Sequence, residues 1–228
     1  MLNIVITGCS SGIGAELVKV FSMEHKVYGL SRSEDKMQLL KSELSNPSNF
    51  NFLVCDILDV NSQLIENWIG VNEVDVLINN AGLLVNKPFD QISKEDYQSV
   101  MGVNFWGVFH LSQLLLEKLG NAKGHIVNIS SMGGVNYSAK FPGLSLYSSS
   151  KGALTTLSEC MAEELNPLGI RVNALALGAV QTEMLANAFP EYKAEVESSE
   201  MALFIYNFVN SSGNMVNGQV VKVASSNP

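Results

Sequence analysis

Tyr147 and Lys151 stand four residues apart in a segment that we expect to be helical. A phenol is a poor acid or base near neutral pH unless a nearby charge stabilises its ionised form. On a helix, residues four positions apart lie one turn apart on the same face, so the ammonium group can stabilise a phenolate. The pair therefore predicts a proton-transfer site. The alternative is an exposed helical pair without chemistry, since this spacing arises by chance in many helices.

A glycine-rich segment, Thr7-Gly8-Cys9-Ser10-Ser11-Gly12-Ile13-Gly14, joins a predicted first strand to a predicted first helix. We expect Gly8 to allow a sharp turn, Gly12 to let a pyrophosphate approach the backbone, and Gly14 to permit close contact between helix and strand. The start of the helix would add N–H donors and the positive end of its dipole. The pattern predicts dinucleotide binding, and the alternative is an ordinary turn. We expect Cys9 to fill space in the loop or, if exposed, to be a reactive thiol.

The elements that must position these residues alternate between strands and helices. Short β-branched runs predict strands at Leu2–Thr7, Lys26–Ser31, Phe50–Cys55, Val74–Asn79, His125–Ser130, Arg171–Ala176 and Gln219–Val223. Helical patterns cover Gly12–Glu24, Glu34–Leu44, Asn61–Ile69, Lys94–Leu119, Leu146–Asn166 and Ser199–Val209. The alternation predicts the α/β class: one Rossmann-like, doubly wound domain over residues 1–228, whose seven-stranded parallel sheet has helices on both faces. Ligands of such sheets bind beyond the carboxyl ends of the strands, so one cleft can hold every motif.

Composition narrows the class of protein. The 228 residues carry a net charge of −8, which disfavours nucleic acid or an anionic membrane as a partner. Cys9, Cys55 and Cys160 are odd in number and widely spaced, so we expect reduced thiols in a cytoplasmic protein. The N-terminal residues lack the basic region of a signal peptide. The three histidines are scattered, so no metal site is expected.

A charge-free stretch, Gln98–Leu116, is long enough to suggest a membrane span. It is interrupted by polar residues, among them Asn104 and His110. We therefore expect a helix buried between the sheet and a partner subunit, and no membrane partner.

The motifs together resemble those of the short-chain dehydrogenase/reductase family. The matching features are Thr7-Gly-x-x-x-Gly-x-Gly14, Asn79-Asn80-Ala81-Gly82, Asn104, Ser131 and Tyr147-x-x-x-Lys151. The resemblance implies an oxidoreductase in which Tyr147 donates the proton, while Lys151 lowers the pKa of the phenol and holds the ribose hydroxyls. It further implies that Ser131 hydrogen-bonds the substrate oxygen, and that Asn104 holds a water that links Lys151 to solvent. Taken singly, Ser131 could be a strand-end cap, and Asn104 could pair with backbone.

The end of the second predicted strand bears on the choice of nicotinamide cofactor. Sites specific for NAD(H) usually carry an acidic residue there, where this chain has Ser31 followed by Arg32. A serine does not repel a 2′-phosphate, and a guanidinium can bind it through two hydrogen bonds. We therefore expect NADP(H) rather than NAD(H). Two features leave the choice open: Arg32 could be a solvated loop residue, and Ser10 and Ser11 replace the basic residue that the glycine loop of NADP-binding relatives often has.

The remaining cofactor contacts follow from the resemblance. Asp56 would accept a hydrogen bond from the adenine amino group, with Ile57 against the ring, although an Asx turn is nearly as plausible for Asp56. The expected cofactor-binding residues are Thr7, Gly8, Ser10, Ser11, Gly12, Ile13, Gly14, Ser31, Arg32, Asp56, Ile57, Asn80, Ala81, Gly82, Tyr147, Lys151, Gly178, Ala179, Val180 and Thr182. Leu177 stands where the family usually has proline. Residues 183–198 are expected to form a substrate lid or a short surface helix.

These expectations favour an NADP(H)-dependent reductase of a ketone or aldehyde. An NAD-dependent dehydrogenase of a secondary alcohol or sugar-like diol is the alternative, and an inactive cofactor-sensing protein is a second. The segments expected around the substrate, including an apparent insertion at Val135–Lys140 and Tyr137 within it, are mainly apolar, which favours a small, neutral to moderately apolar carbonyl compound. We expect a homodimer through the helices at 94–119 and 146–166, or a homotetramer.

Overall fold

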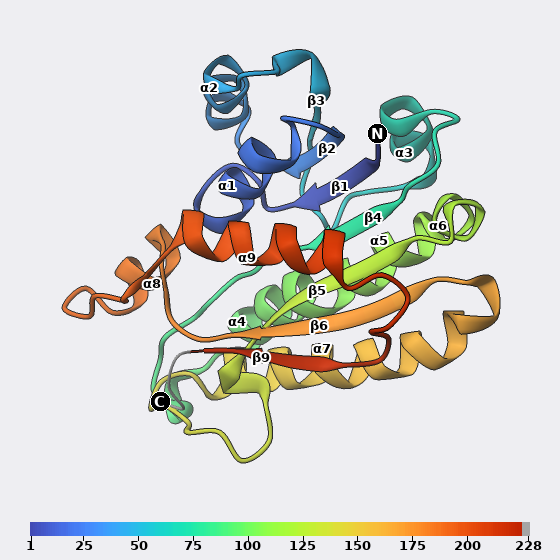
Figure 1. The fold of residues 1–228 in the computed structure, drawn as a ribbon. Coiled ribbons are helices and arrows are strands. Elements are labelled where there is room, and N and C mark those ends of the chain that lie inside the picture. Colours follow the sequence, from blue (N-terminus) through green and yellow to red (C-terminus); the bar gives the residue numbers. More distant parts are fainter. Residues whose placement is uncertain (225–228) are drawn as a thin grey trace.

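A computed structural model describes residues 1–224, and the last residues of the predicted domain, 225–228, lie outside the described range. Parallel strands form a seven-stranded sheet in the order β3-β2-β1-β4-β5-β6-β9 (Figure 1). Its strands are β1 (Asn3–Thr7), β2 (Lys26–Ser31), β3 (Phe50–Val54), β4 (Val76–Asn79), β5 (His125–Ser131), β6 (Arg171–Leu177) and β9 (Val220–Val223). Every predicted strand is present, with ends that differ by no more than two residues, which confirms the predicted parallel sheet. A short parallel pair, β7 (Val180–Gln181) and β8 (Val196–Glu197), was not expected.

Helices cover both faces of the sheet (Figure 1). They are α1 (Gly12–Phe21), α2 (Glu34–Glu43), α3 (Ser62–Ile69), α4 (Lys94–Met101), α5 (Gly107–Leu114), α6 (Leu116–Ala122), α7 (Ser145–Leu165), α8 (Glu183–Ala188) and α9 (Ser198–Ser211). One hydrophobic core joins the sheet to α1, α2 and α9, and the other joins it to α3, α5, α6 and α7. This arrangement confirms the predicted doubly wound α/β fold.

The two cores follow from the alternation of side chains along each strand. In β1, Ile4 and Ile6 point to the core under α1 and α9, while Val5 points to the core under α3 and α5. All three side chains are fully buried. A strand that is covered on both faces reads as a continuous apolar run, which is why the strands were easy to predict.

The single helix predicted at Lys94–Leu119 is wrong. The structure divides it into α4, a π-helical turn (Gly102–Trp106), α5 and α6, with a bend of 61° between the last two. A π-helical turn shifts the backbone hydrogen bonds by one residue and leaves the apolar pattern unbroken, so periodicity does not reveal it. Within residues 1–224, no single helix has the length and apolarity to cross a membrane, although the bent pair of 94–114 and 116–122 passes that test together.

His125, at the start of β5, makes the stability of the fold depend on pH. Asn173 donates a hydrogen bond to its Nε2 atom (2.9 Å), and its Nδ1 atom is buried without a partner among the described residues. Burial, with a smaller contribution from the charge of Arg171, lowers the pKa of His125 to about 3. Between about pH 3 and the ordinary value near 6.5, His125 is protonated in the unfolded chain but neutral in the folded chain. The free energy of unfolding is therefore highest above about pH 6.5 and falls as the pH drops.

We predict that His125 removes about 1.4 kcal/mol from the free energy of unfolding for each pH unit below about 6.5. Chemical unfolding of the native chain and of the His125→Gln variant at pH 7.5 and pH 5.5 measures this effect. The difference between the two proteins cancels the contributions of all other titrating groups. An equal loss of stability in both proteins would contradict the prediction.

Candidate active site

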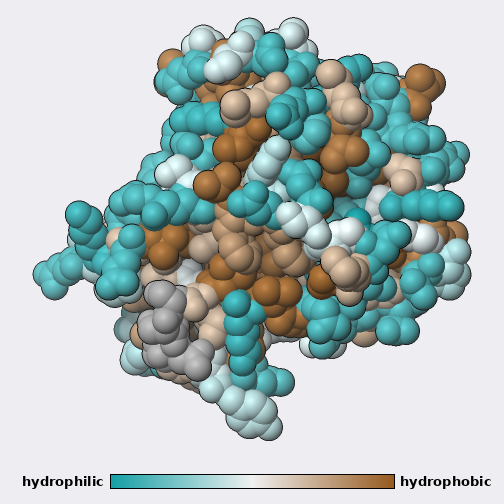
Figure 2. All heavy atoms as spheres, in the orientation of Figure 1, coloured by the Kyte–Doolittle hydropathy of each residue, from teal (hydrophilic) through white to brown (hydrophobic). Residues whose placement is uncertain are grey.

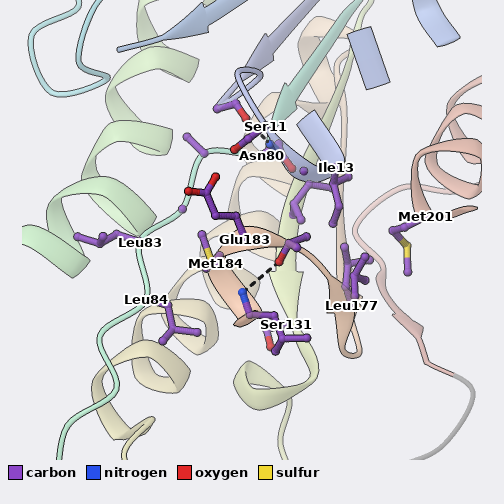
Figure 3. Close-up of a pocket in the computed structure, with 18 of the residues that line it drawn as sticks. Ser11, Ile13, Asn80, Leu83, Leu84, Ser131, Leu177, Glu183, Met184 and Met201 are labelled. Atoms are coloured by element: carbon purple, nitrogen blue, oxygen red, sulfur yellow. Dashed lines mark hydrogen bonds between the residues drawn. The ribbon is translucent and has the colours of Figure 1, made fainter. Parts of the chain in front are cut away.

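A cavity of about 1190 Å³ opens at the carboxyl ends of the strands. It lies where the sheet order reverses between β1 and β4, the place at which open α/β sheets bind ligands. Figure 3 shows the lining side chains converging from several elements, with Ser11 and Asn80 on one side and Leu83, Leu84 and Ser131 below them. Its volume exceeds that of a typical ligand pocket, which leaves room for a cofactor together with a substrate.

The glycine loop has the backbone geometry that the sequence predicts. Gly8 and Gly12 adopt positive φ angles of 66° and 54°. A Cβ atom on Gly8 would lie 2.7 Å from the Cα atom of Ala81, and one on Gly12 would lie 3.3 Å from Thr182. Only glycine has both the conformational freedom and the small size for these positions. The loop therefore forms a cradle in which a phosphate can approach the backbone and the start of α1.

Most of the predicted cofactor residues line the cavity, and three predicted site residues support it from behind. Thr7, Gly14 and Asn104 are absent from the lining. The Thr7 hydroxyl is fully buried and accepts hydrogen bonds from the backbone N–H groups of Asn80 (3.1 Å) and Ala81 (3.0 Å). The Asn80 side chain in turn donates to the carbonyl oxygens of Thr7 (3.0 Å) and Gly8 (3.1 Å). These bonds fasten the end of β4 to the glycine loop.

Tyr147, Lys151 and Ser131 all line the cavity, the first two from α7 and the third from the end of β5. The Lys151 ammonium lies 6.0 Å from the centre of the Tyr147 ring and donates to the carbonyl oxygen of Ile129 (2.8 Å). Burial raises the pKa of Tyr147 to about 12, opposed by a hydrogen bond with Ser131. Burial also lowers the pKa of Lys151 to about 8. In the protein alone the phenol pKa is thus higher than the sequence suggested, because desolvation outweighs the hydrogen bond with Ser131.

Asn104 sits in the π-helical turn and is fully buried. Its Oδ1 atom accepts from the Leu83 N–H (2.7 Å), and its Nδ2 atom donates to the Leu83 carbonyl (2.9 Å) and to the Ser150 hydroxyl (2.9 Å). A Cβ atom on Gly82 would lie 3.6 Å from both Asn104 Oδ1 and Lys151 Nζ. The side chain therefore fixes the segment after β4 beside the ammonium group, with both of its N–H donors in use.

The β2 end of the cavity holds polar residues. The Ser31 hydroxyl donates to Ser10 (2.8 Å), which joins the end of β2 to the glycine loop. Arg32 is mainly exposed and lies 3.5 Å from the Asp56 carboxylate. Asp56 also accepts from the Leu58 N–H (3.0 Å), so the Asx turn that was the alternative for Asp56 is present. The Leu58 N–H binds Oδ1 of Asp56, whereas Arg32 lies next to Oδ2.

Sequence reasoning missed two lining residues here, Ser33 and Lys36. Lys36 belongs to the first turn of α2 and forms an ion pair of 3.1 Å with Glu183 of α8. It follows Arg32 by four residues, so two cations flank the start of α2, one before the helix and one in its first turn. That spacing could have identified it.

Around the Ser131–Tyr147 end the lining is mainly apolar: Leu83, Leu84, Phe141, Leu144, Met184, Leu185 and Phe189. Tyr137 was expected to line the pocket, but it is fully exposed, adopts a positive φ of 64° and lies outside the cavity, as do the other residues of 135–140. The ring of Tyr137 therefore contacts solvent rather than the cavity. Cys9 is fully buried and fills space beneath the glycine loop, as expected. Burial raises the pKa of its thiol to about 12, so the alternative of an exposed, reactive thiol does not apply.

The segment after β6 leaves the sheet and returns through the β7–β8 pair. Thr182 caps α8 by accepting from the Leu185 N–H (3.2 Å). Gln181 accepts hydrogen bonds from the Ala194 N–H (2.9 Å) through its side chain and from the Ser198 hydroxyl (2.6 Å) through its backbone. Both ends of the 182–195 segment are thereby held next to the cavity, whose lining includes Met184 and Leu185 (Figure 3).

Comparisons with known proteins agree with the geometry. A profile of the short chain dehydrogenase family matches residues 2–193. The chain is 34% identical to carbonyl reductase [NADPH] 2 of Sus scrofa over 80% of this chain and 73% of the relative. It is 36% identical to L-xylulose reductase of Bos taurus over 79% and 72%. The solved structure of ElxO with NADP bound superposes with a TM-score of 0.84 at 27% identity, covering 97% and 96%. The chain therefore belongs to the short-chain dehydrogenase family, oxidoreductases that interconvert carbonyl and alcohol groups with a nicotinamide cofactor.

Proposed function

We propose that the protein is an NADP(H)-dependent reductase of a small, neutral to moderately apolar ketone or aldehyde. The observation that carries this proposal is the sharing of one cavity by the glycine loop, by Ser31 and Arg32, and by Ser131, Tyr147 and Lys151. The end of β2 presents a hydroxyl and a guanidinium where a carboxylate would repel a 2′-phosphate. The similarity to carbonyl reductase [NADPH] 2 supports the same direction of reaction.

The chain's own residues supply the proton. When bound, the nicotinamide cofactor supplies the hydride for carbonyl reduction. Tyr147 keeps its proton at neutral pH, because burial raises its pKa to about 12, and it can donate that proton to the carbonyl oxygen. Ser131 accepts a hydrogen bond from the Gly133 N–H (3.1 Å), and its own hydroxyl hydrogen can be donated to the same oxygen when the substrate is bound. Lys151, whose pKa is lowered to about 8, remains mostly charged at neutral pH and stabilises the phenolate that forms.

The cofactor preference is tested by fluorescence titration with NADPH and, separately, with NADH. We expect the native chain to bind NADPH more tightly, and Arg32→Ala to weaken NADPH by about tenfold, the loss of one charge-assisted hydrogen bond at an exposed site. NADH binding to the same variant serves as the control and is expected to stay unchanged. Equal affinity of the native chain for both cofactors would contradict the NADP(H) preference.

The second candidate is an NAD-dependent dehydrogenase of a secondary alcohol or sugar-like diol. The Asp56 carboxylate, 3.5 Å from the Arg32 guanidinium, favours it, because the pair offsets part of the charge that would attract a 2′-phosphate. The similarity to L-xylulose reductase supports a sugar-like substrate. Preference for NADH in the titration above would select this candidate.

We also propose that residues 1–228 form a single domain in which 183–198 is the substrate lid. The lid would cover the apolar lining with Met184, Leu185 and Phe189. Cys9, Cys55 and Cys160 are free thiols, which supports a cytoplasmic location. Limited proteolysis tests the lid: cleavage of the 183–198 segment that a bound substrate does not slow would contradict it.

A homo-oligomer is proposed on the basis of two exposed apolar surfaces. Val108 and Leu154 lie on the two helices expected to form the contact, but both are buried in the chain's own core. The contact would therefore use Trp106 and Phe109, whose stacked rings have centres 5.8 Å apart. A second surface lies near α9 and β9, where Figure 2 shows apolar residues gathered in the middle of the face. Light scattering measures the assembly, and a mass of 24.7 kDa, that of one chain, would contradict it.

A further inference from the structure

Two cations stand at the β2 end of the cavity, and each is paired with a carboxylate from another element. Arg32 pairs with Asp56 at 3.5 Å, and Lys36 pairs with Glu183 at 3.1 Å. All four residues line the cavity. The Lys36–Glu183 pair differs from the other in one respect: it connects α2, which follows the cofactor-binding strand, to the first residue of α8, in the segment proposed as the lid.

The start of α8 lies close to the glycine loop. A Cβ atom on Gly12 would lie 3.3 Å from the Thr182 side chain, and Thr182 caps α8. Figure 3 shows the Glu183 side chain among the side chains that line the cavity. The carboxylate therefore lines the cavity that a dinucleotide would occupy, and Lys36 holds it there through the 3.1 Å ion pair.

We propose that Lys36 is a specificity-determining residue for the 2′-phosphate of NADP(H), and that Glu183 competes with that phosphate for Lys36. This inference rests on the proposed NADP(H) preference. Lys36 lies one helical turn after Ser33, the residue that precedes α2, and α2 follows the strand beside which the adenosine ribose binds. The pyrophosphate, in contrast, binds at the start of α1. The phosphate carries about two negative charges, more than the single carboxylate that it would displace.

Breaking the Lys36–Glu183 pair lowers the free energy of unfolding only slightly, because the pair is exposed. Side-chain exposure is 51% for Lys36 and 63% for Glu183, and exposed ion pairs contribute little to stability. Its effect on binding is larger, since Glu183 repels any phosphate that approaches Lys36. Binding of a 2′-phosphate would release Glu183 from Lys36 and so remove one of the contacts that hold α8. The Thr182 cap would remain, as would the Ala188 carbonyl, which accepts from Asn86 (2.8 Å). The type of cofactor would thus set how firmly the lid segment is held.

Calorimetric titration with adenosine 2′,5′-bisphosphate and with adenosine 5′-monophosphate tests the proposal directly, without a catalytic assay. We expect Lys36→Met to weaken the bisphosphate by about tenfold and Glu183→Gln to tighten it by about threefold, in line with the usual strength of charge-assisted hydrogen bonds at exposed sites, with the monophosphate changed little by either. Lys41→Met is the matched control, since Lys41 lies on the last turn of α2 outside the cavity. Thermal unfolding confirms that each variant is folded.

The double variant separates competition from a general loss of charge. If Glu183 acts through Lys36, the tightening caused by Glu183→Gln disappears in the Lys36→Met background. Tightening that persists there, or that is equal for the monophosphate, would overturn the proposal, as would a Lys41→Met effect as large as that of Lys36→Met. The proposed function fails differently: there the native chain itself would not prefer the bisphosphate over the monophosphate.

The effect on the lid is measured by the rate of tryptic cleavage after Lys193. We expect saturating adenosine 2′,5′-bisphosphate to accelerate this cleavage in the native chain and to leave it unchanged in Glu183→Gln, where the pair is already broken. An unchanged or slower rate in the native chain would overturn the connection between the phosphate and the lid segment.

Discussion

Replacement of Tyr147 by phenylalanine is expected to lower kcat for carbonyl reduction by about 10²–10⁴-fold. The substitution removes the hydroxyl that donates the proton and leaves the ring in place on α7. Ser131 and Lys151 remain, but neither replaces the phenol as proton donor. A serine hydroxyl is a much weaker acid than a phenol, and the Lys151 ammonium donates to the Ile129 carbonyl (2.8 Å). Single-turnover kinetics, followed by the absorbance of the nicotinamide cofactor, measure the loss.

The matched control for this prediction is Tyr137→Phe. Tyr137 lies ten residues before Tyr147, is fully exposed and is outside the cavity. We expect this variant to turn over at the native rate. The affinity for NADPH should stay within about threefold of native in both variants, because the loss belongs to proton transfer and not to binding. Turnover within tenfold of native in Tyr147→Phe would contradict the role assigned to the phenol.

Replacement of Gly14 by alanine is expected to destabilise the fold by about 1–3 kcal/mol, although alanine is the better helix former. The added Cβ atom would overlap the backbone carbonyl oxygen of Gly8 and lie 2.6 Å from the Asn80 amide. Neither group can move freely, since Asn80 donates to the carbonyls of Thr7 and Gly8. The glycine loop would have to shift away from α1. Chemical unfolding measures the loss of stability, and cofactor titration is expected to show weaker binding.

Gly120→Ala provides the control, because Gly120 also lies within a helix, α6, and a Cβ atom there would meet nothing within 4 Å. This change is expected to stabilise the protein by about 0.5–1 kcal/mol through helix propensity alone. The opposite signs of the two substitutions isolate the effect of the crowded loop. A stabilising effect of Gly14→Ala would show that helix and strand can separate there without cost.

The sheet could be predicted because each of its strands is a short apolar run between turn residues. The helix at 94–119 could not be predicted correctly, because a π-helical turn and the bend at Leu115 depend on hydrogen bonds and packing rather than on the pattern of apolar residues. Gly107 illustrates the difference: a Cβ atom there would lie 2.9 Å from Ile57, a contact between distant segments that periodicity does not register. The strands β7 and β8 have two residues each, too few for alternation to show.

The residues of the candidate site also fall into those that sequence motifs predict correctly and those that they do not. Residues that directly follow strands, such as Ser131 and Ala81, line the cavity because parallel strands deliver their ends to one edge. Thr7 and Asn104 were placed in the site by motif, and the structure shows them bonded to backbone behind it. Lys36 escaped notice because it belongs to a helix, and the turn of the helix, not a strand end, brings it to the cavity. Sequence motifs mark the end of a strand more reliably than the side of a helix.

The β7–β8 pair has a consequence for how this chain could acquire new substrates. Because two paired strands and the Gln181 hydrogen bonds fix both ends of the 182–195 segment, the segment is an excursion with anchored ends. The entropy needed to close such an excursion grows only slowly with its length, so residues can be inserted, deleted or exchanged between the anchors at small thermodynamic cost. Such changes would leave the sheet and Tyr147 in place. Substrate selectivity can therefore evolve, or be engineered, by exchange of the 182–195 segment alone.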